Sequence, residues 1–132
     1  MNIEIANFLD VARVKTGDIP ESSVRKTTID GVVDTGASRL VLPKSVVDQL
    51  ELPVAGRTKA KLADQSVVER DVVNYVWLKM LDREGVFSAV VEPNRDDALI
   101  GAIVMEELDM VVDCVTGTCH PRDPELLITE LD

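Results

Sequence analysis

Short runs of β-branched residues, separated by turn signals at intervals of about ten residues, constrain the fold of this chain more than any other feature. Valine is the commonest residue, and the aromatic residues are only two Phe, one Tyr and one Trp, so the core must be mainly aliphatic. The pattern is typical of an all-β sandwich or barrel. We predict strands at residues 3–14, 24–33, 39–42, 57–62, 67–80 and 86–91, with shorter strands around residue 99 and at 110–114 and 126–131.

Two segments depart from the β pattern and predict short helices. At residues 43–50, Pro43 suits a first helical turn, and the valines and leucine that follow fall on one side of a helix. Residues 101–108 are rich in good helix formers. The sequence has no internal repeat, low-complexity tract or linker, so we expect residues 1–132 to form a single domain.

The most informative segment is residues 31–43, GVVDTGASRLVLP. Two valines lead into Asp34, Thr35 and Gly36 form a sharp turn after it, and a second apolar strand leaves the turn. Glycine lets backbone groups approach the carboxylate closely, and the threonine hydroxyl can orient a neighbouring loop. By itself the triplet Asp-Thr-Gly also suits an ordinary turn whose aspartate binds its own backbone, so other segments must decide between the two interpretations.

Residues 31–43 resemble the active-site segment of the retropepsin-like, or retroviral-type, aspartic proteases. Two further segments resemble that family in the same order along the chain. In the family, an apolar-apolar-Gly element opens a helix and packs beside the catalytic turn; here Leu-Ile-Gly at residues 99–101 precedes the predicted helix, and a strand that ends in an acid follows. Residues 59–73 read as two strands joined at 63–66, where the family carries the flap hairpin that closes over bound peptide.

The resemblance implies a retropepsin-like all-β fold, a closed barrel or sandwich of short strands with a flap hairpin and one or two short helices. It implies that Asp34 is catalytic and that no metal or other cofactor takes part. The flap turn lacks glycine, and a plain exposed hairpin is the alternative interpretation of it. The other site residues that the resemblance implies are Thr35, Gly36, Ala37 and Ser38 in the active-site turn, Ala63, Asp64, Gln65, Ser66 and Val67 in the flap and substrate site, and Leu99, Ile100 and Gly101 packed beside the turn.

An aspartic protease needs two carboxylates that share one proton and hold one water between them. Like charges at that distance cannot both ionise, so the ionised carboxylate takes a proton from the water while the protonated one donates to the carbonyl oxygen of the scissile amide. This chain contains one such segment, whereas pepsin-like enzymes carry two in a longer chain. The resemblance therefore implies a homodimer, with Asp34 and its symmetry mate as the pair, that acts as an endopeptidase on extended polypeptides.

Two other functions fit the same sequence. The dimer can be a module that binds a peptide or protein with little or no turnover, because a catalytic motif does not show that the flap closes or that the proton is correctly placed. It can also be a β-domain that dimerises only to assemble a larger complex. A transition-state mimic of the statine type separates these functions, because it should bind a protease tightly, a binding module weakly and a scaffold not at all.

The chain is acidic, with 14 Lys and Arg against 24 Asp and Glu and a formal charge of −10. This charge repels phosphate backbones and anionic membrane surfaces, so neither nucleic acid nor a membrane is an expected partner. A dimer doubles the charge, which favours neutral or basic peptides. The first residues do not read as a secretory signal, and the longest apolar run, residues 98–105, is too short to cross a bilayer. With only two cysteines, the sequence predicts a cytoplasmic protein.

Cys114, Cys119 and His120 form a C-x4-C-H cluster that can be interpreted as a metal site. The spacing is not that of a common zinc knuckle, and the chain has no second pair of ligands. We therefore predict a hairpin turn at residues 115–118 between two thiols that can cross-link under oxidation. His120 is the single histidine and no nucleophile motif accompanies it, so a Ser or Cys hydrolase is not expected.

Two further predictions concern packing. Tyr75 and Trp77 share one face of the predicted strand 67–80, which favours a packing role over a ligand platform. Residues 125–131 are too apolar for a free tail, and the chain ends of retropepsin-like dimers commonly build a small sheet between subunits. We therefore expect this segment to form a strand in the dimer interface, with residues 3–14 as the next candidate.

Overall fold

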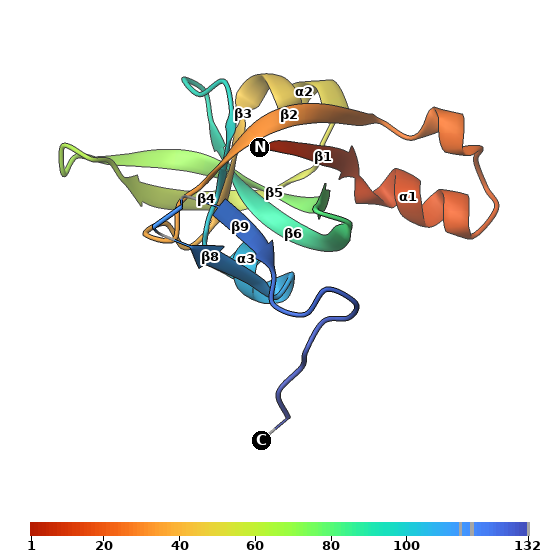
Figure 1. The fold of residues 1–132 in the computed structure, drawn as a ribbon. Coiled ribbons are helices and arrows are strands. Elements are labelled where there is room, and N and C mark those ends of the chain that lie inside the picture. The colour runs from red at the N-terminus through yellow and green to blue at the C-terminus, as the bar shows by residue number, and fades with distance from the viewer. Residues whose placement is uncertain (114, 117, 132) are drawn as a thin grey trace.

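The computed structural model describes residues 1–113, 115–116 and 118–131 of the chain. Strands predominate within these residues, and short helices interrupt them (Figure 1). The helical segments are α1 (Phe8–Lys15), the 3-10 turn η1 (Glu21–Ser23), α2 (Lys44–Leu50) and α3 (Ala102–Glu107). The strands are β1 (Asn2–Asn7), β2 (Lys26–Val33), β3 (Leu40–Pro43), β4 (Val54–Lys61), β5 (Val67–Met80), β6 (Arg83–Glu92), β7 (Ala98–Ile100), β8 (Met110–Asp113) and β9 (Thr118–Pro121).

The main sheet closes into a barrel. Its strands follow the order β1-β2-β7-β3-β6-β5-β4, and β1 also pairs with β5 in antiparallel register from Glu4 opposite Lys79 to Asn7 opposite Val76. This pairing joins the first strand back to the sheet and leaves β4 outside the closed ring. A separate two-stranded sheet consists of β8 and β9. The predicted closed all-β fold with short helices is confirmed.

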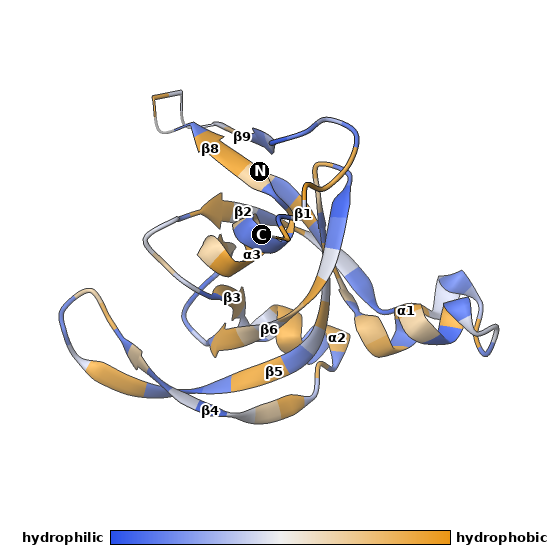
Figure 2. Ribbon diagram, turned by 90° about the horizontal axis from the view of Figure 1, so that it is seen from below, coloured by the Kyte–Doolittle hydropathy of each residue, from blue (hydrophilic) through white to orange (hydrophobic). Residues whose placement is uncertain are grey.

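The barrel interior is aliphatic because side chains alternate between the two faces of each strand. Figure 2 shows hydrophobic and hydrophilic stretches following one another along β5. Phe87 is the one aromatic side chain in the core of the described residues. The largest fully buried side chains include Ile3, Ile5, Leu40, Leu42, Leu50, Leu78, Met80, Ile100 and Leu108.

Most predicted elements are present, with shifted ends. β5 has the predicted bounds, and α2 and α3 occupy the two predicted helical segments. Pro43 does not lie in the first turn of α2, because it ends β3 in an extended conformation and precedes the helix. Across the described ranges, no helix is both long and apolar enough to span a membrane.

The prediction of one strand over residues 3–14 is wrong in its second half. β1 ends at Asn7, whose side-chain oxygen accepts a hydrogen bond from the backbone N–H of Leu9 at 3.0 Å and so caps α1. The Asn7 amide also donates to the carbonyl oxygen of Leu50 at 3.0 Å, so the cap is anchored to the end of α2. A contact between residues so distant in sequence gives no signal in the local pattern.

The strand predicted at residues 126–131 is not formed in the part of the segment that the structure describes. The backbone N–H of Ile128 donates to Asp109 Oδ2 at 2.9 Å, and the Ile128 carbonyl oxygen accepts from Arg122 at 3.1 Å. These side chains bind the backbone groups that a sheet ladder would use. Leu126 and Leu131 remain exposed, at 75% and 87% of their surface.

Candidate active site

Asp34 leaves the end of β2 in an open turn. Its backbone N–H donates to the carbonyl oxygen of Ile100 at 3.0 Å, which ties the turn to β7. Asp34 Oδ1 accepts from the backbone N–H of Gly36 at 2.9 Å, and the Asp34 carbonyl oxygen accepts from Ala37 at 3.1 Å. Asp34, Thr35 and Gly36 are all exposed. The turn therefore orients the carboxylate and leaves it open to solvent, to a ligand or to a second chain.

Helix α3 begins directly on this turn. Its first two backbone N–H groups donate to the carbonyl oxygens of Ala37 and Ser38 at 2.8 and 3.0 Å. A Cβ atom at Gly101 would lie 2.5 Å from the carbonyl oxygen of Arg39 and 2.7 Å from the carbonyl carbon of Ser38, so no side chain fits between helix and turn. The structure thus brings residues 99–101 against residues 37–39.

An apolar surface lies beside the end of β2 that carries Asp34. Val41 on β3 pairs with Leu99 on β7, and both side chains are half-buried. The neighbouring Leu40 and Ile100 point into the core, so Val41 and Leu99 belong to the opposite face of the sheet. Because β7 lies between β2 and β3, this pair is next to the turn. The sequence pattern alone indicates no site role for Val41.

The predicted flap is the hairpin of β4 and β5. Its turn is closed by the backbone N–H of Leu62, which donates to the carbonyl oxygen of Ser66 at 2.9 Å. Asp64 Oδ1 accepts from both the hydroxyl and the backbone N–H of Ser66, and these bonds lower the pKa of the Asp64 carboxyl. Gln65 has a φ of 73° and takes the left-handed position that glycine usually fills, which explains a turn without glycine.

The flap turn and the Asp34 turn project toward the same side of the barrel, the left in Figure 1. Ala63 to Val67 are all exposed. Among the described residues, no hydrogen bond or ion pair joins them to residues 34–38. The flap residues therefore lie together in one hairpin turn and do not contact the Asp34 carboxylate.

A cavity of about 800 Å³ lies beside the active-site turn, between α3 and the C-terminal segment. Thr35 lines one side, and Met105, Asp109, Arg122 and Ile128 line the others. The hydrogen bond from the Ile128 N–H, followed by that from Arg122 at 2.9 Å, lowers the pKa of Asp109. The C-terminal segment is thus anchored beside the turn by side chains that its own sequence pattern does not reveal.

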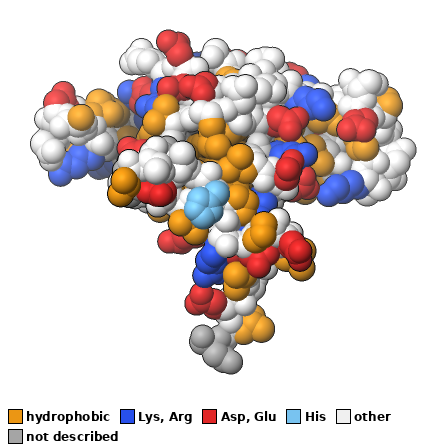
Figure 3. Space-filling view, viewed as in Figure 1, with side chains coloured by type: hydrophobic (Ala, Val, Ile, Leu, Met, Phe, Trp, Pro, Cys, Tyr) orange, Lys and Arg blue, Asp and Glu red, His pale blue; other side chains and the backbone are white. Residues whose placement is uncertain are grey.

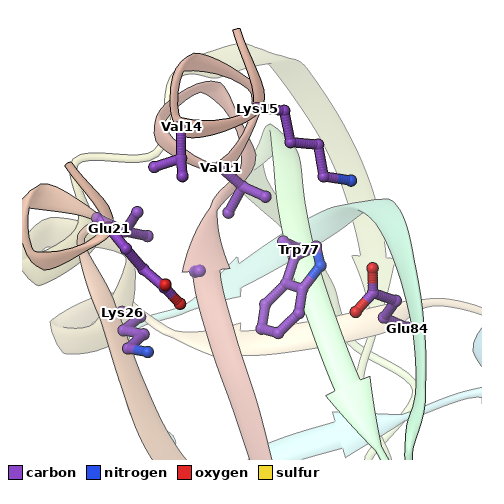
Figure 4. Close-up of a pocket in the computed structure, with 9 residues that line it drawn as sticks. Val11, Val14, Lys15, Glu21, Lys26, Trp77 and Glu84 are labelled. Carbon is purple, nitrogen blue, oxygen red and sulfur yellow. The ribbon is translucent and has the colours of Figure 1, made fainter. Parts of the chain in front are cut away.

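A separate pocket of about 250 Å³ lies between α1 and strands β1 and β5, away from Asp34. Figure 4 shows the Trp77 ring facing this space below Val11 and Val14 of α1. Trp77 is half-buried, in keeping with a packing role. Tyr75 is more exposed, with 44% of its surface accessible; the β5–β6 register shifts beside it and its φ is 61°.

The cysteine cluster can be described only in part, because Cys114 lies outside the described residues. Cys119 is half-buried on β9, and burial raises the pKa of its thiol. His120 Nδ1 lies 2.9 Å from the carbonyl oxygen of Pro121. In the ranges that the structure describes, no three His, Cys, Asp or Glu side chains are grouped so that they can hold a metal. The strands on both sides of the predicted hairpin turn are present as β8 and β9.

A comparison with protein families matches residues 14–104 to the family described as aspartyl protease. The matched range is more than half of the chain and contains the Asp34 turn, the flap and residues 99–101. The chain belongs to the aspartyl protease family. Among solved structures, it is similar to the solution structure of the simian foamy virus (mac) protease, with 16% sequence identity and a TM-score of 0.48 over 60% of this chain and 81% of that chain. A search of curated proteins found no match.

The space-filling view in Figure 3 shows acidic, basic and hydrophobic side chains interspersed on one face of this aspartyl protease. Large apolar side chains are exposed on β2, α3 and β8. Val32, Ile103 and Val111 have 42%, 51% and 37% of their surface exposed. The hairpin of β8 and β9 follows the region that the family comparison matches.

Proposed function

We propose that this aspartyl protease is an endopeptidase that cleaves polypeptides as a homodimer, with Asp34 of each subunit forming the catalytic pair. The observation that carries the proposal is the exposed Asp34 carboxylate, which the Gly36 N–H orients in a turn whose residues 37–39 lie against the start of α3 at Gly101. A carboxylate held in this way is ready to meet a second one across a two-fold axis.

The reaction needs both carboxylates. When two are close together, their mutual repulsion keeps one protonated at a pH at which the other is ionised. The ionised Asp34 accepts a proton from water, whose oxygen attacks the carbonyl carbon of the scissile amide, while the protonated Asp34 donates to the carbonyl oxygen. The resulting tetrahedral intermediate collapses as the amide nitrogen is protonated and the C–N bond breaks. Two peptides with a new carboxyl and a new amino group are released.

Exposed apolar side chains support a second copy of the chain as the partner. Val32, Ile103 and Val111 lie in or beside the elements that carry the active-site turn, and all three are more than a third exposed. Thr35 is exposed as well, so its hydroxyl is free to bind across the axis. Burying these apolar groups in a dimer removes them from water and at the same time completes the catalytic pair.

The exchange Asp34→Asn tests the catalytic assignment. The amide has the same shape but cannot cycle a proton, so kcat for a peptide substrate should fall by at least about a thousandfold with an unchanged midpoint of thermal unfolding. Asp82→Asn is the matched control, because Asp82 is also exposed in a turn and lies far from Asp34 in sequence. Equal cleavage by the Asp34→Asn variant and the parent would refute the proposal.

The shared site also makes activity depend on concentration. Specific activity should fall when the protein is diluted below the dimer dissociation constant, because only the dimer contains the pair. Sedimentation velocity and initial rates over one dilution series should change together. Constant specific activity in a sample that sediments as a monomer would exclude the shared site. Weak binding of a statine-type peptide, together with no cleavage of substrate peptides, would instead favour a binding module.

A further inference from the structure

Arg39 ends the active-site turn at the edge of the sheet from which Asp34 emerges. β2 and β7 are parallel, with Val33 opposite Ile100, whereas β3 runs antiparallel to β7. The C-terminal end of β2 and the N-terminal end of β3 therefore meet at the same edge, on the two sides of β7. Two strand spacings separate the backbones of residues 34 and 39, which is a distance of about 10 Å.

The side chain of Arg39 belongs to the face of β3 that turns away from the core. Leu40 and Leu42 are buried inside the barrel, so alternation puts Arg39 on the same face as Val41. Val41 and its partner Leu99 form the apolar surface beside Asp34. The guanidinium therefore stands at the border of the surface that a peptide would cross on its way to the carboxylate.

Among the residues that the structure describes, Arg39 lacks a carboxylate partner, which most arginines of this chain have. It is half-buried, and its Nη2 donates to the Ser88 hydroxyl on β6 at 3.1 Å. Among the described residues, no carboxylate lies within ion-pair distance of it. The other arginines that are at least half-buried have stronger partners: Arg25 binds Asp10 and Glu51, Arg70 binds Glu92, Arg95 binds Asp97, and Arg83 donates to the carbonyl oxygens of Leu108, Asp109 and Asp123.

This isolation is informative because the chain has 24 acidic side chains for 14 basic ones. A guanidinium has five N–H donors in a planar fork that matches a carboxylate, and one hydroxyl satisfies only one of them. The Ser88 contact orients the group and leaves donors available. Arg39 is thus a preoriented cation without an anion.

We propose that Arg39 selects substrates with an acidic side chain, Asp or Glu, about three residues from the scissile bond. An extended peptide rises about 3.3 Å per residue, so its third residue from Asp34 reaches the 10 Å separation estimated above. The inference rests on the proposed function, because it assumes that a peptide crosses Asp34. It also assigns a local preference that runs against the negative charge of the whole chain, whose field is screened beyond about 8 Å at physiological ionic strength.

The test is a set of peptides that are identical except for Glu, Gln or Lys at one position, scanned through the four residues on each side of the cleaved bond. For the parent, kcat/KM at one position should favour Glu over Gln by about tenfold to a hundredfold, as for a charge-assisted hydrogen bond. Arg39→Gln should abolish this preference, and Arg39→Glu should reverse it toward Lys. Arg13→Glu makes the same change of net charge on exposed α1 and should leave the preference intact.

The reversal separates a specificity role from a structural one, because a merely destabilised turn would slow all three peptides equally. No preference at any scanned position in an active parent, or the same preference in the Arg39→Glu variant, would overturn the inference and leave the protease assignment standing. Fluorescence anisotropy of labelled peptides on the Asp34→Asn variant supplies a readout without cleavage. If the parent cleaves nothing but this variant binds the Glu peptide more tightly in an Arg39-dependent way, the proposed function fails and the acidic preference stands.

Discussion

Gly101→Ala is the change that most directly tests whether α3 is seated on the active-site turn. The added Cβ would lie 2.5 Å from the Arg39 carbonyl oxygen, 2.7 Å from the Ser38 carbonyl carbon and 2.8 Å from the Ala37 carbonyl oxygen. All three atoms belong to the backbone, so rotation of a side chain cannot relieve the overlap. Either the helix or the turn has to move.

The cost can be estimated from the contacts that such a movement would break. The hydrogen bonds from the first turn of α3 to Ala37 and Ser38 measure 2.8 and 3.0 Å, and each contributes about 1 kcal/mol to the free energy of unfolding. Over-packing of a tight contact costs a further 1–3 kcal/mol, roughly. We expect a total loss of about 3–5 kcal/mol, a large part of the 5–15 kcal/mol that is typical for a small domain.

Urea unfolding followed by circular dichroism measures this loss. With an m value of about 2 kcal/mol/M, the midpoint should fall by about 1.5–2.5 M for Gly101→Ala. Gly56→Ala is the matched control, because a Cβ there meets no atom within 4 Å and the backbone is not left-handed, so its midpoint should change by less than about 0.3 M. An unchanged midpoint for Gly101→Ala, or an equal loss for Gly56→Ala, would refute the steric reasoning.

Two further predictions concern acid stability and the C-terminal segment. Arg25 donates three hydrogen bonds to the buried Asp10 carboxylate at 2.8–3.0 Å. These bonds lower the pKa of Asp10, and those from the Arg25 side chain lower it most. This stabilisation is fully present above the pKa of Asp10 in the unfolded chain and is lost as the pH falls through the lower folded value. Asp10→Asn should therefore lower the free energy of unfolding by about 2 kcal/mol near neutral pH and reduce the further decrease of that free energy below about pH 4. Denaturation curves measure both effects, and Asp82→Asn should show neither. Deletion of residues 125–132 should raise the dimer dissociation constant, measured by sedimentation, by at least about tenfold, because the exposed leucines of this segment would be buried in the dimer. Far-UV circular dichroism should change little. An unchanged dissociation constant would show that the interface lies elsewhere.

The sequence predicts elements well where the local pattern and the tertiary environment agree. β5 has the predicted ends, and over Val76–Met80 every second side chain is buried in the barrel, as its sequence pattern requires. Residues 3–14 carry Ile and Val at both ends and no Gly or Pro between them, so the same rule extends the strand past Asn7. The helix there depends on Asn7, whose amide binds Leu50 across the fold, and a pairwise contact of this kind leaves no trace in a short window of sequence.

In the candidate site, too, local motifs were predictable and contacts that depend on the fold were not. The turn at Asp34 and its contact with residues 99–101 were predictable because each is a short motif with the order of a known family. The role of Val41 was not predicted, since it depends on which face of β3 lies beside β7. The anchoring of Ile128 by Asp109 and Arg122 also joins segments whose meeting only the fold decides.

Charge shows most clearly why counting residues is insufficient. An excess of acids over bases predicts that each arginine finds a carboxylate and that the protein repels acidic peptides. In the fold, the hydrogen-bond partner of each arginine depends on which residues lie next to it. Arg39 donates to the hydroxyl of Ser88 because strand β6 pairs with β3 and places Ser88 beside it. Its charge therefore remains available on β3, whose backbone lies two strand spacings from that of Asp34, and a direct contact with a bound peptide there outweighs a screened long-range field. The net charge governs how a peptide approaches, whereas the position of Arg39 governs which peptide is held in register for cleavage.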